Sequence, residues 1–156
     1  MTNQLLTFTL DNNVYAFEVF KVQEVLEYSE PVKIPCASPY IKGLINSRGN
    51  GISVTDLRQK FSLPEHEPTK DTRIIVVEVS KPTDENPDRI ITFGAVTDSV
   101  LEVLEVDEQD VEPPPKFGNT ISPEYISGLT KKDDKFIIIL NEKTIFSQSE
   151  LPAVTE

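Results

Sequence analysis

Cys36 and His66 are the single cysteine and the single histidine of the chain, and they are the side chains best suited to nucleophilic or metal chemistry. One cysteine cannot form an internal disulfide, and one cysteine with one histidine cannot build a structural zinc site. We expect Cys36 to be a small buried residue. His66 lies in Pro64–Pro68, a charged stretch typical of an exposed linker. The sequence has neither a Gly-rich phosphate loop nor a nucleophile elbow. We therefore predict no catalytic residue, no metal and no cofactor.

Carboxylates are the other candidates for chemistry, because the chain has 26 acidic residues and a formal charge of −11. The acidic run Asp107–Asp110 lacks the spaced oxygen ligands and the glycine of a calcium loop, so it is expected to be a solvated loop. Asp98 and Glu102 are carboxylates that a small acid-catalysed hydrolase could use, provided that two carboxyls converge and one has a perturbed pKa. This is a remote alternative. The negative charge argues against binding to nucleic acid.

The size and the apolar pattern predict a folded protein of the cytoplasm. A chain of 156 residues can bury a substantial core without metals or disulfides. Its longest apolar run, Phe136–Leu140, is far shorter than the roughly 20 residues that span a bilayer, and the N-terminus lacks the pattern of a signal segment. We expect a soluble cytoplasmic protein without direct membrane insertion.

Alternation of apolar and polar residues with a period of two, typical of half-buried strands, recurs along the chain. A short turn at 19–22 followed by a strand is also expected, and 80–88 has the turn chemistry of a hairpin tip. The run at 136–140 is rich in β-branched residues and is expected to be well buried. Strands are predicted over 4–10, 14–18, 52–55, 73–79, 89–96, 98–106 and 136–140.

A short helix is predicted directly after the strand at 52–55. Asp56 stands where its side chain can accept a hydrogen bond from an amide of the first helical turn. Leu57 and Phe61 are four residues apart and would lie on one face of that helix. The polar, proline-bearing stretch 62–71 follows, and it is the best candidate for a boundary between two lobes.

Two segments of the chain are similar to each other. YIKGL at 40–44 is followed by YISGL at 125–129, and the match continues without gaps to Phe61 and Phe146, which are also 85 positions apart. Asp56 aligns with Asn141, and both residue types cap helices well. Upstream, 24–27 matches 102–105 at an offset of 78. The repeat predicts two similar lobes of short strands, about 14–62 and about 70–146, completed by the N-terminal strand and the C-terminal segment. Small closed barrels suit such lobes because they leave no exposed edge.

From about Leu5 to Leu151, the sequence resembles the CheW family, the adaptor proteins of bacterial chemotaxis. The resemblance implies one CheW-like domain over 1–156, built from two SH3-like five-stranded β-barrel lobes with short helices. It also implies a non-enzymatic adaptor that couples methyl-accepting chemoreceptors to the histidine kinase CheA. The motifs that carry it are 20–25, 39–49, 56–61, 94–98 and 112–117.

Four residues match family positions implicated in binding the receptor or the kinase: Val22, Glu24, Gly43 and Arg48. We expect Glu24 and Arg48 to approach each other near the surface. Val22 could equally belong to the core, and Gly43 could serve backbone geometry alone. The sequence departs from the family at Ser47, where most members are apolar, and at Ser53 and Thr55, which predict a wetter strand face or a different partner.

The partners implied by the resemblance are the receptor tip, the regulatory domain of a CheA-like kinase, and other CheW copies in rings beneath the membrane. The protein would then lie at the inner face of the membrane through receptor arrays. Two alternatives have the same domain in other settings: another receptor-kinase pathway, or the CheW-like portion of a CheV-type protein. No receiver domain follows Leu151, which argues against an intact CheV.

Overall fold

The chain forms two five-stranded sheets joined by short helices, which confirms the predicted mainly β fold. The computed structural model describes residues 2–35, 39–113 and 123–146. Cys36 and the last two prolines of the triple-proline motif, Pro114 and Pro115, lie outside the described residues. The helical segments are η1 (Val19–Lys21), α1 (Leu57–Lys60), η2 (Glu108–Asp110), η3 (Pro123–Tyr125) and α2 (Glu142–Ile145).

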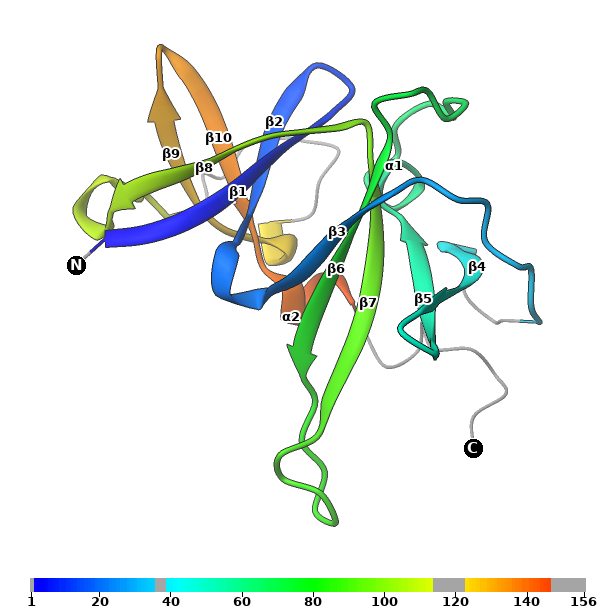
Figure 1. Ribbon diagram of the computed structural model, residues 1–156. Coiled ribbons are helices and arrows are strands. Elements are labelled where there is room, and N and C mark those ends of the chain that lie inside the picture. The colour runs from blue at the N-terminus through cyan, green and yellow to red at the C-terminus, as the bar shows by residue number, and fades with distance from the viewer. Residues whose placement is uncertain (1, 36–38, 114–122, 147–156) are drawn as a thin grey trace.

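Each sheet forms one lobe, and the two lobes lie side by side (Figure 1). Lobe A has the strand order β8-β1-β2-β10-β9, and lobe B has the order β3-β6-β7-β5-β4. The strands of lobe A are β1 (Thr2–Leu10), β2 (Asn13–Glu18), β8 (Ser99–Asp107), β9 (Ile126–Lys132) and β10 (Lys135–Leu140). The strands of lobe B are β3 (Val22–Glu27), β4 (Ile41–Ser47), β5 (Asn50–Asp56), β6 (Arg73–Ser80) and β7 (Ile90–Thr97).

A single backbone bridge joins the two edges of each sheet. In lobe B the chain beyond β3 returns to β4, where Val32 and Leu44 exchange hydrogen bonds of 2.8 and 2.9 Å. In lobe A the chain beyond β8 returns to β9, where Glu112 and Leu129 exchange bonds of 2.7 and 2.8 Å. Each sheet is thereby closed into a small barrel, which satisfies backbone groups at its edges.

The internal repeat corresponds to a repeated structural unit. Hairpin β4–β5 followed by α1 matches hairpin β9–β10 followed by α2, and β5 and β10 each add a parallel neighbour, β7 and β2. The Asp56 side chain accepts a hydrogen bond from the Gln59 amide (3.3 Å), and the Asn141 side chain accepts one from the Lys143 amide (3.0 Å). Both predicted helix caps are therefore confirmed.

The sheets divide the chain differently from the predicted lobe limits of about 14–62 and about 70–146. Strands β3 to β7 all belong to lobe B, whereas lobe A combines β1–β2 with β8–β10. The linker 62–71 thus connects two strands of lobe B. The difference arises because β1–β2 fills in lobe A the places that β6–β7 fills in lobe B, and sequence similarity between neighbouring segments does not report such distant pairing. The chain crosses between the lobes twice, at η1 and at Asp98.

The largest apolar core lies between the lobes and is shared by them. Leu57 and Phe61, predicted to share a helix face, are both fully buried in it. Phe61 stacks on Tyr15 of lobe A with ring centroids 5.7 Å apart, and Phe93 of lobe B stacks on Phe146 of lobe A at 4.9 Å. Aromatic pairs at these separations add to the free energy gained by burial. The shared core makes the two lobes one packed unit.

Two predictions about burial are wrong. Phe136, placed in a well-buried strand, is 58% exposed, because the inward positions of β10 begin at Ile137. Ser53 and Thr55, expected either on a wetter face or against a different partner, are buried, because they lie beside Phe93 and Ala95 of β7, which belong to the core shared by the lobes. The Thr55 hydroxyl has no hydrogen-bond partner within the described structure.

Candidate functional site

Glu24 and Arg48, predicted to approach each other, form an ion pair at one end of lobe B. Glu24 lies on β3, and its Oε1 is 3.5 Å from Nη2 of Arg48. The other carboxylate oxygen, Oε2, accepts a hydrogen bond of 2.7 Å from Ser47 Oγ. The pair thus joins strand β3 to the β4–β5 turn, two segments that are not neighbours in the sheet.

The β4–β5 turn places the Arg48 side chain at the surface. Arg48 and Gly49 both have positive φ, 55° and 84°, as the two central residues of a type I′ hairpin turn do. The Gly49 amide donates to Asn46 Oδ1 at 2.9 Å, which holds the turn. Glycine adopts such a conformation without steric cost. The Arg48 side chain is 69% exposed and the Glu24 side chain 20%, so the pair presents a cation above a half-buried anion.

Because the Arg48 side chain is so exposed, the ion pair contributes only about 0–1 kcal/mol to stability. Ser47 is buried and gives the Glu24 carboxylate a second partner. Such an arrangement orients charge for recognition more than it stabilises the fold.

Val22 and Gly43 each contribute to the structure of lobe B, Val22 through packing and Gly43 through the close approach of two backbone segments. Val22 is half-buried and packs against the shared core, opposite Val77. Gly43 has a φ of 150°, and a Cβ at this position would lie 2.2 Å from the Val32 carbonyl oxygen. No side chain fits there while Val32 remains bridged to Leu44. The roles of Val22 and Gly43 in binding a partner stay predictions.

Lobe A carries a related ion pair at the matching place. Glu102 on β8 corresponds to Glu24 by the offset of 78, and Lys132 corresponds to Ser47 by the offset of 85. Lys132 Nζ lies 2.9 Å from Glu102 Oε2, and this hydrogen bond raises the pKa of Lys132. The internal repeat aligns both positions, but it does not single out Lys132, because the aligned residue is a serine.

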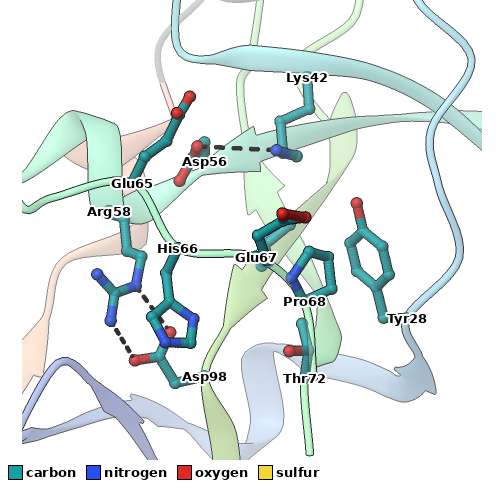
Figure 2. A pocket seen from close by; sticks show the side chains of 11 residues that line it. Tyr28, Lys42, Asp56, Arg58, Glu65, His66, Glu67, Pro68, Thr72 and Asp98 are labelled. Atoms are coloured by element: carbon teal, nitrogen blue, oxygen red, sulfur yellow. Dashed lines mark hydrogen bonds and ion pairs between the residues drawn. The ribbon is translucent and has the colours of Figure 1, made fainter. Parts of the chain in front are cut away.

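A cavity of about 320 Å³ lies under the linker 62–71. His66 of this linker is one of the residues that line the cavity (Figure 2). Beside it, Arg58 donates from Nε and Nη2 to the two carboxylate oxygens of Asp98, at 2.9 and 2.8 Å. Lys42 and Asp56, which also line the cavity, form a longer pair at 3.9 Å. Opposite charges alternate along these walls. His66 is exposed, as the linker pattern predicts.

The carboxylates of the hydrolase alternative, Asp98 and Glu102, belong to separate ion pairs. Burial by itself would raise the pKa of Asp98, but the hydrogen bonds from Arg58 and from the Asp11 amide, together with the Arg58 charge, hold it below its ordinary value. A carboxyl kept ionised in this way is a poor proton donor. Among the described residues, no group of three or more His, Cys, Asp or Glu side chains could hold a metal ion.

Comparison with known proteins agrees with this arrangement of two related barrels. The family model described as CheW-like domain matches residues 4–150. The chain belongs to the CheW family. It is 30% identical over 151 residues to "Chemotaxis protein CheW" of Klebsiella aerogenes, covering 97% of this chain and 86% of that protein. It is 29% identical over 153 residues to the Bacillus subtilis protein of the same name, covering 96% and 92%.

A solved structure of the family has the same fold. The crystal structure of scaffolding protein TtCheW from Thermoanaerobacter tengcongensis matches with a TM-score of 0.83 and 33% sequence identity, covering 98% of this chain and 93% of that chain. As a CheW-like protein, this chain is a non-enzymatic coupling adaptor of chemotaxis. None of the helices in the described ranges is long and apolar enough to cross a membrane.

Proposed function

We propose that this CheW-like adaptor couples the cytoplasmic tip of methyl-accepting chemoreceptors to the regulatory domain of a CheA-like histidine kinase. The coupling is by binding and geometry, without chemistry on the adaptor. The protein acts in the cytoplasm, at the inner face of the membrane where receptors form arrays, and other CheW copies join it in rings. Val22, Glu24, Gly43 and Arg48 take part in binding the receptor or the kinase.

The observation that supports this proposal best is the Glu24–Arg48 pair. Family membership identifies an adaptor, and an adaptor requires a surface that recognises its partner. The Arg48 guanidinium is 69% exposed, lies 3.5 Å from a half-buried carboxylate, and contributes little to the stability of the fold. Charged groups of this kind set the specificity and the rate of association. The Arg48 side chain therefore meets the requirements of a recognition residue.

Arg48→Glu tests the proposal, with Lys143→Glu, the same change of charge at an exposed site on lobe A, as the matched control. The assay measures co-sedimentation with receptor-containing membranes and recruitment of the kinase, next to a thermal melt of each variant. Arg48→Glu should lose co-sedimentation or kinase recruitment while its melting temperature stays near that of the wild type, because an exposed pair is worth only about 0–1 kcal/mol.

Normal co-sedimentation and kinase recruitment by Arg48→Glu would remove this residue from the interface. A large drop of its melting temperature would make its role structural. Failure of the unaltered protein in both binding steps would refute the proposed function itself.

A further inference from the structure

The four-residue helix α1 of lobe B carries two cations that are almost fully buried, Arg58 and Lys60, at 9% and 8% exposure. A buried cation is costly unless it is paired and hydrogen-bonded. Both side chains find their partners across the boundary between the lobes.

Arg58 holds the second crossing of the chain. Its contact with Asp98 is two-pronged, and Nη2 also lies 3.5 Å from Oδ1 of Asp11 in the β1–β2 turn of lobe A. The Asp98 carboxylate accepts the Asp11 amide at 2.7 Å, and the Asp98 amide donates to the Thr9 carbonyl of β1 at 3.0 Å. Nη1 of Arg58 donates to Pro64 O at 2.6 Å, within lobe B. One guanidinium thus joins the linker, the crossing and the turn of the other lobe.

Lys60 lies between the two copies of the internal repeat. Its Nζ donates to the Ile145 carbonyl at the end of α2. The same Nζ is 5.2 Å from the ring centre of Tyr40 and 5.3 Å from that of Tyr125, the repeat-related tyrosines. Cations at these distances are attracted to the aromatic face, more strongly where water is excluded. Lys60 therefore contacts lobe B on one side and lobe A on the other.

The two copies of the repeat differ at these positions. Arg58 aligns with Lys143, which is exposed, and Lys60 aligns with Ile145, which is buried and apolar. Only one helix of the pair therefore provides cationic contacts to the opposite lobe. The rings of the shared core have preferred geometries, but apolar burial itself is non-directional, whereas the two-pronged charged hydrogen bonds of Arg58 fix an angle.

We propose that Arg58 and Lys60 are positioning residues that set the angle between the lobes, and with it the relative placement of the partner-binding surfaces. The shared core holds the lobes together, and α1 selects one of the arrangements that the core alone would allow. The statement about partner-binding surfaces rests on the proposed function. The statement about the angle does not.

The angle can be measured on the protein alone with two spin labels. In a Cys36→Ser background, Glu27→Cys on β3 and Glu105→Cys on β8 place labels at exposed, repeat-related sites, one on each lobe. Pulsed electron spin resonance then reports the distance distribution between the labels. Arg58→Gln removes the two-pronged contact, and Lys60→Met removes the charge at similar volume. Lys143→Gln, at the exposed counterpart of Arg58, is the matched control.

The unaltered protein and Lys143→Gln should show one narrow peak in the distance distribution. In Arg58→Gln and Lys60→Met this peak should broaden or shift, while the circular dichroism spectrum stays β-rich. If Arg58→Gln fails to fold, Arg58→Lys, which keeps the charge without the fork, should still broaden the peak. A narrow, unshifted peak in Arg58→Lys and Lys60→Met would overturn the proposal. Equal broadening in Lys143→Gln would do the same.

A binding measurement then separates this proposal from the proposed function. Arg58→Gln, or Arg58→Lys in its place, should bind the receptor preparation and the kinase domain singly, as the unaltered protein does, but should lose simultaneous binding of both. Simultaneous binding at the unaltered level would refute the link between lobe angle and coupling. If the unaltered protein binds neither partner, the proposed function fails, and the spin-label distances still decide whether α1 sets the angle.

Discussion

Substitution of Gly43 by alanine should open the barrel of lobe B. A Cβ at this position would lie 2.2 Å from the Val32 carbonyl oxygen and 2.7 Å from the Val32 carbonyl carbon. Real Cβ atoms do not approach backbone atoms so closely, and a backbone segment cannot rotate away as a side chain can. The segment around Val32 must therefore move away from β4, which breaks the bridge between Val32 and Leu44.

The expected loss follows from the bonds of that bridge. Two backbone hydrogen bonds, of 2.8 and 2.9 Å, join Val32 to Leu44. At about 1 kcal/mol each, their loss lowers the free energy of unfolding by about 2 kcal/mol. For a chain of 156 residues, this corresponds to a drop in melting temperature of about 4–8 °C. Partner binding should fall together with stability, unlike in Arg48→Glu.

Two other glycines make the measurement a graded series. At Gly128 an added Cβ would meet Val111 Cγ1 at 2.7 Å and Glu112 O at 3.0 Å, so Gly128→Ala should lose less, because a side chain can shift. At Gly51 the nearest atom is Leu44 Cδ1 at 3.8 Å, so Gly51→Ala should melt at or slightly above the wild-type temperature. If Gly43→Ala melts like Gly51→Ala, the steric account of the barrel closure is refuted.

Two further predictions concern buried polar groups. Thr55→Val removes a fully buried hydroxyl that has no partner among the described residues, so it should raise the free energy of unfolding in urea by about 1 kcal/mol. Thr97→Val deletes a hydroxyl that donates to Arg73 O, so it should lower that free energy. Equal effects of the two changes would contradict this reasoning. The pKa of Asp98 is lowered from 3.8 in the folded protein, so its stabilising effect is present above pH 3.8 and is lost as the pH falls through the folded-state pKa. The difference in unfolding free energy between the wild type and Asp98→Asn should therefore shrink as the pH is lowered below 3.8, and a difference independent of pH would show that the carboxylate charge does not stabilise the fold.

Features governed by neighbouring residues could be predicted from the sequence. The turn at 19–22 followed by a strand, the hairpin around 80–88, the Asp56 cap and the burial of Leu57 with Phe61 all depend on contacts within a few residues, and all are present. The Glu24–Arg48 pair was also expected, but from the family resemblance, because strand patterns alone do not bring β3 to the β4–β5 turn.

Features governed by distant pairing could not be predicted in this way. Alternation shows that Ser53 and Thr55 share a face, but it does not show that this face, together with Phe93 and Ala95 of β7, packs in the core between the lobes. The same limit explains the exposed Phe136 and the lobe limits. The local pattern does not single out Arg58 and Lys60, because their partners lie far along the chain, at Asp98 and Ile145.

The interleaved path of the chain has a consequence for biosynthesis. The β1–β2 hairpin, with Phe8 and Phe17 on its apolar side, is made before the other strands of both lobes, yet its partners β8 and β10 are made after all the strands of lobe B. At 5–20 residues per second, the wait from β2 to the end of β10 is roughly 6–24 s. Strands β3 to β7 can pair during that interval, whereas β1 and β2 stay without their neighbours β8 and β10. The nascent hairpin is therefore the segment for which a holding chaperone matters most.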